Sequence, residues 1–144
     1  MKVEYRCDCP ITTGLDIIGD RWNLVIIKQM FFQKKKTFKE FLDSSENIAS
    51  NILSTRLKFL LENEIITFKR LPEQKKIKIY SLTQKGLDLL PLIVEINIWS
   101  NKHLRKENPI MLTNEQLGIE LIDEDKEQFK EVALENYKKL MSAY

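Results

Sequence analysis

The chain has 144 residues, of which 43% are hydrophobic and 31% charged, and its formal net charge is +2. These values are typical of a globular protein with a buried core and argue against a disordered or fibrous chain. No apolar run comes near the roughly 20 residues that a membrane-spanning helix needs. Residues 1–6 contain no apolar stretch of the kind that a secretory signal has, so we expect a cytoplasmic protein.

The charge is unevenly distributed along the chain. Residues 20–80 carry 13 Lys and Arg against seven Asp and Glu, whereas residues 107–136 carry two against nine. A basic middle followed by an acidic end indicates an anion-binding face in the middle of the chain. Composition alone equally allows two solvated faces without a partner.

Helical periodicity dominates the first 63 residues. The pattern predicts a short helix over 12–18 and a second helix over 21–32 with a buried apolar stripe. Thr37 and Glu40 have the capping-box spacing and open a third, short helix. A longer helix is predicted over about 49–63, with Asn47 or Ser50 available as its cap.

A β-hairpin and two long helices are predicted after residue 64. Residues 65–71 and 77–80 have strand character, and 72–76 form a polar, basic tip between them. Thr83 is expected to cap one long helix that runs to about His103 and bends at Pro91. A further helix is expected over 124–141.

The short helix that begins at Thr37 is followed by a polar turn and by the longer helix predicted over about 49–63. This is the helix-turn-helix arrangement, in which the second helix enters the major groove of DNA. The basic hairpin beside them can reach flanking phosphates. The residues expected at the DNA are Ser50, Asn51, Ser54, Thr55, Arg56 and Lys58 of the helix, with Lys75 and Lys76 of the hairpin tip. The alternative is a winged helix that binds protein instead of DNA.

The motifs also resemble a known family, the HxlR-type winged helix-turn-helix regulators of bacteria. The resemblance runs from Cys9-Pro10 through Leu15–Trp22, Phe38–Phe41, Ile48–Leu53, Arg56-Leu57, Leu60, Ile65-Ile66 and Tyr80–Gly86 to Trp99. It covers about residues 9–103 and implies a mainly α fold with a small hairpin, a helix bundle with a two- or three-stranded wing. It further implies a transcriptional regulator that binds an inverted-repeat operator in double-stranded DNA as a homodimer, with the first and last helices in the dimer interface.

The composition of the helix over 87–99 also predicts a dimer. Its large apolar residues lie around nearly the whole helix, which is more than one core can cover. The residues expected in the interface are Leu90, Ile93, Val94, Ile98 and Trp99. We therefore expect a DNA-binding domain over 1–105, which includes an N-terminal dimerisation segment, and a helical extension over 106–144 that joins the dimer interface.

The two cysteines, Cys7 and Cys9, are too few and too close together for a disulfide framework. Even with His103, the single histidine, they cannot supply four zinc ligands, so no metal or cofactor is expected. Cys9 precedes Pro10 at a helix start, where the helix dipole favours a thiolate. Some HxlR-type regulators use a cysteine at this point to sense oxidants or electrophiles, which makes Cys9, with Cys7 beside it, the candidate sensor. An unreactive thiol is the alternative.

An enzymatic function finds no support in the sequence. There is no Gly-rich phosphate loop and no Ser/His/Asp or Cys/His arrangement within a catalytic motif. No small-molecule effector is indicated either. The sequence therefore predicts a binding protein.

Overall fold

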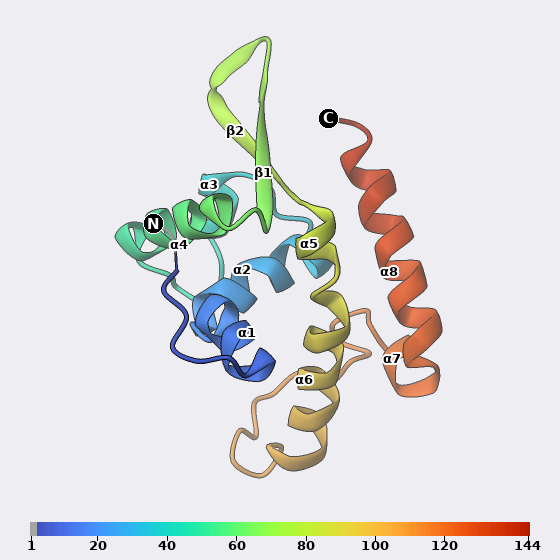
Figure 1. Cartoon of the computed structure of the whole chain (residues 1–144). Helices are drawn as coiled ribbons and strands as arrows, with labels where there is room; N and C mark the ends of the chain where they lie inside the picture. The colour runs from blue at the N-terminus through green and yellow to red at the C-terminus, as the bar shows by residue number, and fades with distance from the viewer. Residues whose placement is uncertain (1–2) are drawn as a thin grey trace. The chain divides into compact units, whose positions relative to one another are not determined.

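The computed structural model describes residues 3–144 and contains two compact units (Figure 1). One unit holds the residues up to Leu87 together with Tyr144, and the other holds Asp88–Ala143. The predicted division at 105/106 separates a DNA-binding domain from an extension in the dimer interface, and it stays a prediction. Residues 1–2 of the predicted DNA-binding domain lie outside the described residues.

The first unit consists of helices and a hairpin that projects from them (Figure 1). Its elements are α1 (Pro10–Ile18), α2 (Arg21–Phe32), α3 (Phe38–Leu42), α4 (Ser50–Glu62), β1 (Ile66–Leu71), β2 (Gln74–Leu82) and α5 (Gln84–Leu87). The mainly α fold with a small wing is thus confirmed, and the wing has two strands.

Local sequence signals explain where the first helices begin. α1 starts at Pro10, two residues before the predicted start, because proline needs no N–H partner in the first helical turn. α2 starts after Asp20, whose carboxylate accepts the N–H of Trp22 at 2.9 Å. The apolar stripe of α2 is buried, with Ile27 and Met30 fully covered.

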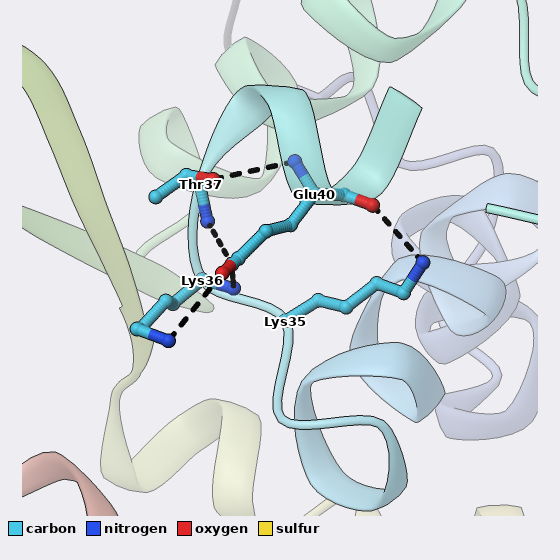
Figure 2. Close-up of polar contacts among 4 residues, drawn as sticks. All are labelled: Lys35, Lys36, Thr37 and Glu40. Carbon is cyan, nitrogen blue, oxygen red and sulfur yellow. Dashed lines mark hydrogen bonds and ion pairs between the residues drawn. The ribbon is translucent and has the colours of Figure 1, made fainter. Parts of the chain in front are cut away.

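The predicted capping box of α3 is formed (Figure 2). The N–H of Glu40 donates to Oγ1 of Thr37 at 3.3 Å, and Oε2 of Glu40 accepts the N–H of Thr37 at 3.0 Å. The same oxygen accepts the N–H of Lys36 at 2.6 Å, and Nζ of Lys35 donates to the carbonyl of Glu40 at 3.0 Å. Two of the three consecutive lysines therefore hold α3 in place.

Because Glu40 is titratable, changing the pH tests how much its contacts with Lys36 and Thr37 contribute to the free energy of unfolding. Partial burial opposes its ionisation, but the N–H groups of Lys36 and Thr37 and the Lys36 ammonium outweigh burial, so the pKa of Glu40 lies below its ordinary value. A carboxylate with a lowered pKa stabilises the fold above its unfolded pKa and loses that contribution as the pH falls through the folded pKa.

Glu40→Gln is accordingly expected to lower the free energy of unfolding by about 0.5–1 kcal/mol at pH 7. The deficit should shrink as the pH falls from about 4.3, the ordinary pKa of a Glu carboxyl, through the lower pKa that Glu40 has in the folded protein. Urea unfolding at pH 7 and near pH 3 measures both values, with Glu131→Gln on α8 (Lys126–Met141) as the control. A deficit that is equal at the two pH values would contradict this account.

The hairpin is longer than the sequence predicts. Ile66 pairs with Leu82 and Phe68 with Tyr80, and a register shift follows Arg70. β2 already begins at Gln74, so the turn is reduced to residues 72–73 and the tip predicted over 72–76 is wrong. The base of the wing is tied to the loop before α3, since the N–H of Tyr80 donates to the carbonyl of Lys36 at 2.7 Å.

The predicted long helix after Thr83 is interrupted. Thr83 does cap a helix, because its Oγ1 accepts the N–H of Gly86 at 3.2 Å, but that helix, α5, ends at Leu87. α6 (Leu90–His103) then begins anew, with Pro91 in its first turn. Pro91 therefore starts a helix instead of bending one. Gly86 is required for close packing, since a Cβ there would lie 2.3 Å from the carbonyl oxygen of Ile65.

The second unit contains α6, α7 (Leu121–Glu124) and α8, and the sequence does not predict α7 as a separate helix. α8 runs along α6 (Figure 1), and Nζ of Lys126 lies 2.7 Å from Oε1 of Glu95. Asn114 fixes the intervening loop: its amide donates to Asp123 at 2.9 Å and accepts from Asn97 at 3.0 Å. Within residues 3–144, no helix has the length and apolarity required to cross a membrane.

Candidate nucleic-acid interface

α4 turns a polar face towards solvent. Leu53, Leu57 and Leu60 are at most 2% exposed and form its inward stripe. The predicted DNA-contacting residues that lie exposed on this helix are Ser50, Asn51, Ser54, Thr55 and Lys58. Because residues three and four apart share a helix face, Asn51, Thr55 and Lys58 lie together on the side opposite the leucines.

The start of α4 has no side-chain cap. Its N-cap is Ala49, and the cap from Asn47 or Ser50 that the sequence allows is not formed. The first-turn N–H groups of a helix have no partner inside the helix and attract anions such as phosphate. The exposed polar residues at this end are thus accompanied by backbone donors.

Arg56 lies on the flank of α4 and not on its outward face. Its NH1 is 3.6 Å from Oδ2 of Asp20, and its guanidinium stacks 5.2 Å from the ring centre of Phe59. Asp20 therefore caps α2 and contacts α4 at the same time. These contacts give Arg56 a role in fixing the angle between α2 and α4, and its predicted contact with the DNA backbone stays a prediction.

Four of the five cations on the wing lie in two groups. Lys75 and Lys76 are exposed at the start of β2, beside the turn, and no ion pair involves either side chain in the described part of the chain. Nearer the base, Arg70 pairs with Lys78 across the strands, and both cations lie over the ring of Phe68, at 5.6 and 4.5 Å from its centre.

Arg70 and Lys78 are not among the residues that the sequence predicts at the DNA. A cross-strand alignment would have found them, because residues paired across a hairpin point to the same face. That face borders α4, since a hollow of about 260 Å³ is lined by residues of α3, α4 and β2. The lining includes Ser54 and Lys58 of α4 and Lys78 and Tyr80 of β2. Lys58 of α4 and Lys78 of the wing therefore border one concave surface.

Cys9 is the N-cap residue of α1, half-buried and free, and Cys7 is exposed and free. The backbone N–H groups of Thr12 and Ile11, followed by the side chain of Thr12, lower the pKa of the Cys9 thiol. Arg6 does not share in this effect, because its guanidinium pairs with Asp16 at 2.7 Å. The helix start alone therefore favours the thiolate.

The residues predicted for the dimer interface fall into two classes. Leu90, Ile93 and Val94 are at most 7% exposed within the single chain, and their contact with a partner stays a prediction. Ile98 is half-buried and Trp99 is 56% exposed. An exposed apolar stripe, formed by Leu92, Ile96 and Trp99, runs along α6 instead. Among residues 3–144, no cluster of His, Cys, Asp or Glu is arranged to bind a metal ion.

Comparison with known proteins identifies this arrangement. A model of HxlR-like helix-turn-helix proteins matches residues 17–108. The chain belongs to the HxlR-like helix-turn-helix family. Its relatives include helix-turn-helix transcriptional regulators of bacteria, and the matched residues include α3 and α4. Residues 109–144 lie outside the match.

Sequence and structure relatives agree on the family. The HTH-type transcriptional regulator YodB of Bacillus subtilis is 35% identical over 95 residues, which are 65% of this chain and 84% of YodB. The structure of reduced YodB is similar with a TM-score of 0.55 at 32% identity, over 69% of this chain and 98% of YodB. The redox regulator HypR in its oxidised form is similar with a TM-score of 0.58 at 29% identity, over 66% and 97% of the two chains.

Proposed function

We propose that this protein is a cytoplasmic, non-enzymatic transcriptional regulator that binds an inverted-repeat operator in double-stranded DNA as a homodimer. In this proposal α4 enters the major groove and the wing contacts phosphates beside it. The observation that carries the proposal is the concave surface on which Ser54 and Lys58 of α4 meet Lys78 of the wing. A module that binds only protein would have no need for unpaired cations at the wing.

The test starts from the full chain and a pool of random duplexes. Selection should enrich an inverted repeat whose half-sites lie about one helical turn, roughly 34 Å, apart. Binding of the enriched duplex is then measured by fluorescence anisotropy at several salt concentrations. The logarithm of the binding constant should fall linearly with the logarithm of the salt concentration, because phosphate contacts release counterions. If no duplex is enriched and no salt-dependent binding is found, the chain is a winged-helix module for protein binding.

A dimer is the second part of the proposal. Two recognition helices related by a two-fold axis match the symmetry of an inverted repeat. The exposed stripe of α6 supplies one apolar surface, and the exposed Ile11 and Leu15 on α1 supply another. We assign both surfaces, with the 106–144 extension, to the interface.

Cys9 gives the regulator a candidate sensor. YodB has been solved in reduced, diamide-treated and quinone-bound forms, and HypR is described as a redox regulator. Here the lowered pKa of Cys9 favours the thiolate, which is the nucleophilic form of cysteine. We propose that modification of Cys9 by an oxidant or electrophile changes operator affinity, with Cys7 as the less reactive thiol.

Thiol labelling at a series of pH values should show that Cys9 reacts faster than Cys7 and titrates below the free value of about 8.5. The comparison uses Cys7→Ser and Cys9→Ser, each of which leaves a single thiol. Operator binding by Cys7→Ser should still respond to diamide, whereas Cys9→Ser should not respond. An unchanged response in Cys9→Ser would exclude Cys9 as the sensor.

A further inference from the structure

The first turn of α4 carries a large apolar side chain that faces solvent. Ile52 is the third residue of the helix and is 38% exposed, although Leu53 beside it is fully buried. With Asn51, Thr55 and Arg56 it lines a hollow of about 450 Å³ that is completed by residues 20–22 at the start of α2. Ile52 is not among the residues that the sequence predicts at the DNA.

Thr55 adds a second apolar group at the same place. Its hydroxyl donates to the carbonyl of Asn51 at 2.9 Å, within the helix. The hydroxyl proton is therefore occupied, and what Thr55 offers to a ligand is its methyl group and the lone pairs of its oxygen. Ile52 and Thr55 together place aliphatic carbon beside the amide of Asn51, near the N-terminal end of the recognition helix.

The chemistry of the major groove specifies what such a surface can read. Among the base edges exposed there, thymine alone presents an apolar group, its C5-methyl, and adenine presents the acceptor and donor pair that an asparagine amide matches. The N-terminal residues of a recognition helix are those that approach base edges most closely. An aliphatic pair beside an asparagine therefore matches A·T pairs better than G·C pairs.

We propose that Ile52, together with the methyl of Thr55, contacts thymine C5-methyl groups and makes the protein select A·T pairs under the first turns of α4. The inference rests on the proposed function, since it requires that α4 enters the major groove. It adds a residue that determines specificity and predicts the base composition of that part of each half-site.

Replacement of thymine by uracil tests the contact, because it removes only the C5-methyl and keeps every hydrogen-bonding group of the base pair. The duplex selected with the full chain is resynthesised with uracil at one thymine position of a half-site at a time. The parent should bind about fourfold more weakly at the contacted position, the equivalent of one buried methyl, and about fifteenfold more weakly when both half-sites are changed.

Ile52→Ala is the decisive variant. It should bind the thymine duplex more weakly than the parent does and should lose most of the difference between thymine and uracil. Ile77→Ala removes an isoleucine of similar exposure, 41%, from β2 and should keep the full difference. Thermal unfolding of both variants checks that the fold is retained, which is expected because both side chains are solvent-facing.

The outcomes separate this inference from the proposed function. If the parent binds no duplex in a salt-dependent manner, the proposed function itself is wrong. If the parent binds its operator but no position distinguishes uracil from thymine, or if the selected half-sites lack A·T pairs, the thymine-methyl contact is wrong. A uracil penalty that is the same in Ile52→Ala and in the parent would overturn the role of Ile52.

Discussion

Ile96→Asp is expected to convert the proposed dimer into folded monomers and to lower operator affinity at least hundredfold. Leu92, Ile96 and Trp99 are 37%, 43% and 56% exposed and lie four and three residues apart, so they form one stripe along α6. In a two-fold dimer built on this stripe, the substitution places one carboxylate from each chain in an apolar interface. Two desolvated charges without partners oppose association by more than the roughly 3 kcal/mol that a hundredfold loss represents.

The variant should nevertheless fold, because Ile96 faces solvent in the single chain and a charge there remains hydrated. Sedimentation equilibrium at sub-micromolar concentration measures the state of association, and anisotropy with the selected operator measures affinity. Gln33→Glu adds the same charge to an exposed position at the end of α2 and should leave both quantities unchanged. An Ile96→Asp protein that still sediments as a dimer and binds the operator like the parent would place the interface elsewhere.

Lys75→Ala combined with Lys76→Ala is expected to weaken binding to every duplex by about one to two orders of magnitude at low salt. Both ammonium groups are exposed on β2 and lack an ion pair among residues 3–144, so they are available for phosphate. Each lost phosphate contact should reduce the slope of log affinity against log salt by about 0.9, which predicts a change of about 1–2 units.

Sequence preference should survive in this variant, because phosphate contacts position a protein on DNA and do not read bases. The matched control is Lys138→Ala with Lys139→Ala, which removes two adjacent exposed lysines from α8. It lowers the net charge equally and should leave the salt slope unchanged. If the wing and α8 variants lose affinity to the same extent, net charge and not the wing explains binding.

The sequence by itself determined the order of the elements as far as the hairpin, and the two faces of α4. The stripe of Leu53, Leu57 and Leu60 has helical spacing, so one side of the helix had to be buried and Asn51 and Thr55 had to face away from it. The capping box of α3 was predictable for the same reason, since it depends on two residues three positions apart. Local spacing is sufficient where the interaction is local.

Local spacing does not predict contacts between residues that are far apart in the sequence. Arg56 has the character of a phosphate-binding residue, yet it contacts Asp20, which lies 36 positions earlier and is adjacent only after α2 and α4 pack. The stacking of Lys78 on Phe68 likewise depends on the register of the hairpin, which the pattern of residues 65–80 did not fix.

The surface available to a partner was decided by tertiary structure as well. The composition of the helix after Thr83 indicated more apolar residues than one core could cover, but it could not divide them between core and surface. In the structure Leu90 and Val94 are buried, whereas Ile96 and Trp99 are exposed. An apolar side chain in the sequence indicates that burial is favourable. Which residues bury it depends on how the helices pack, and the sequence pattern does not show this.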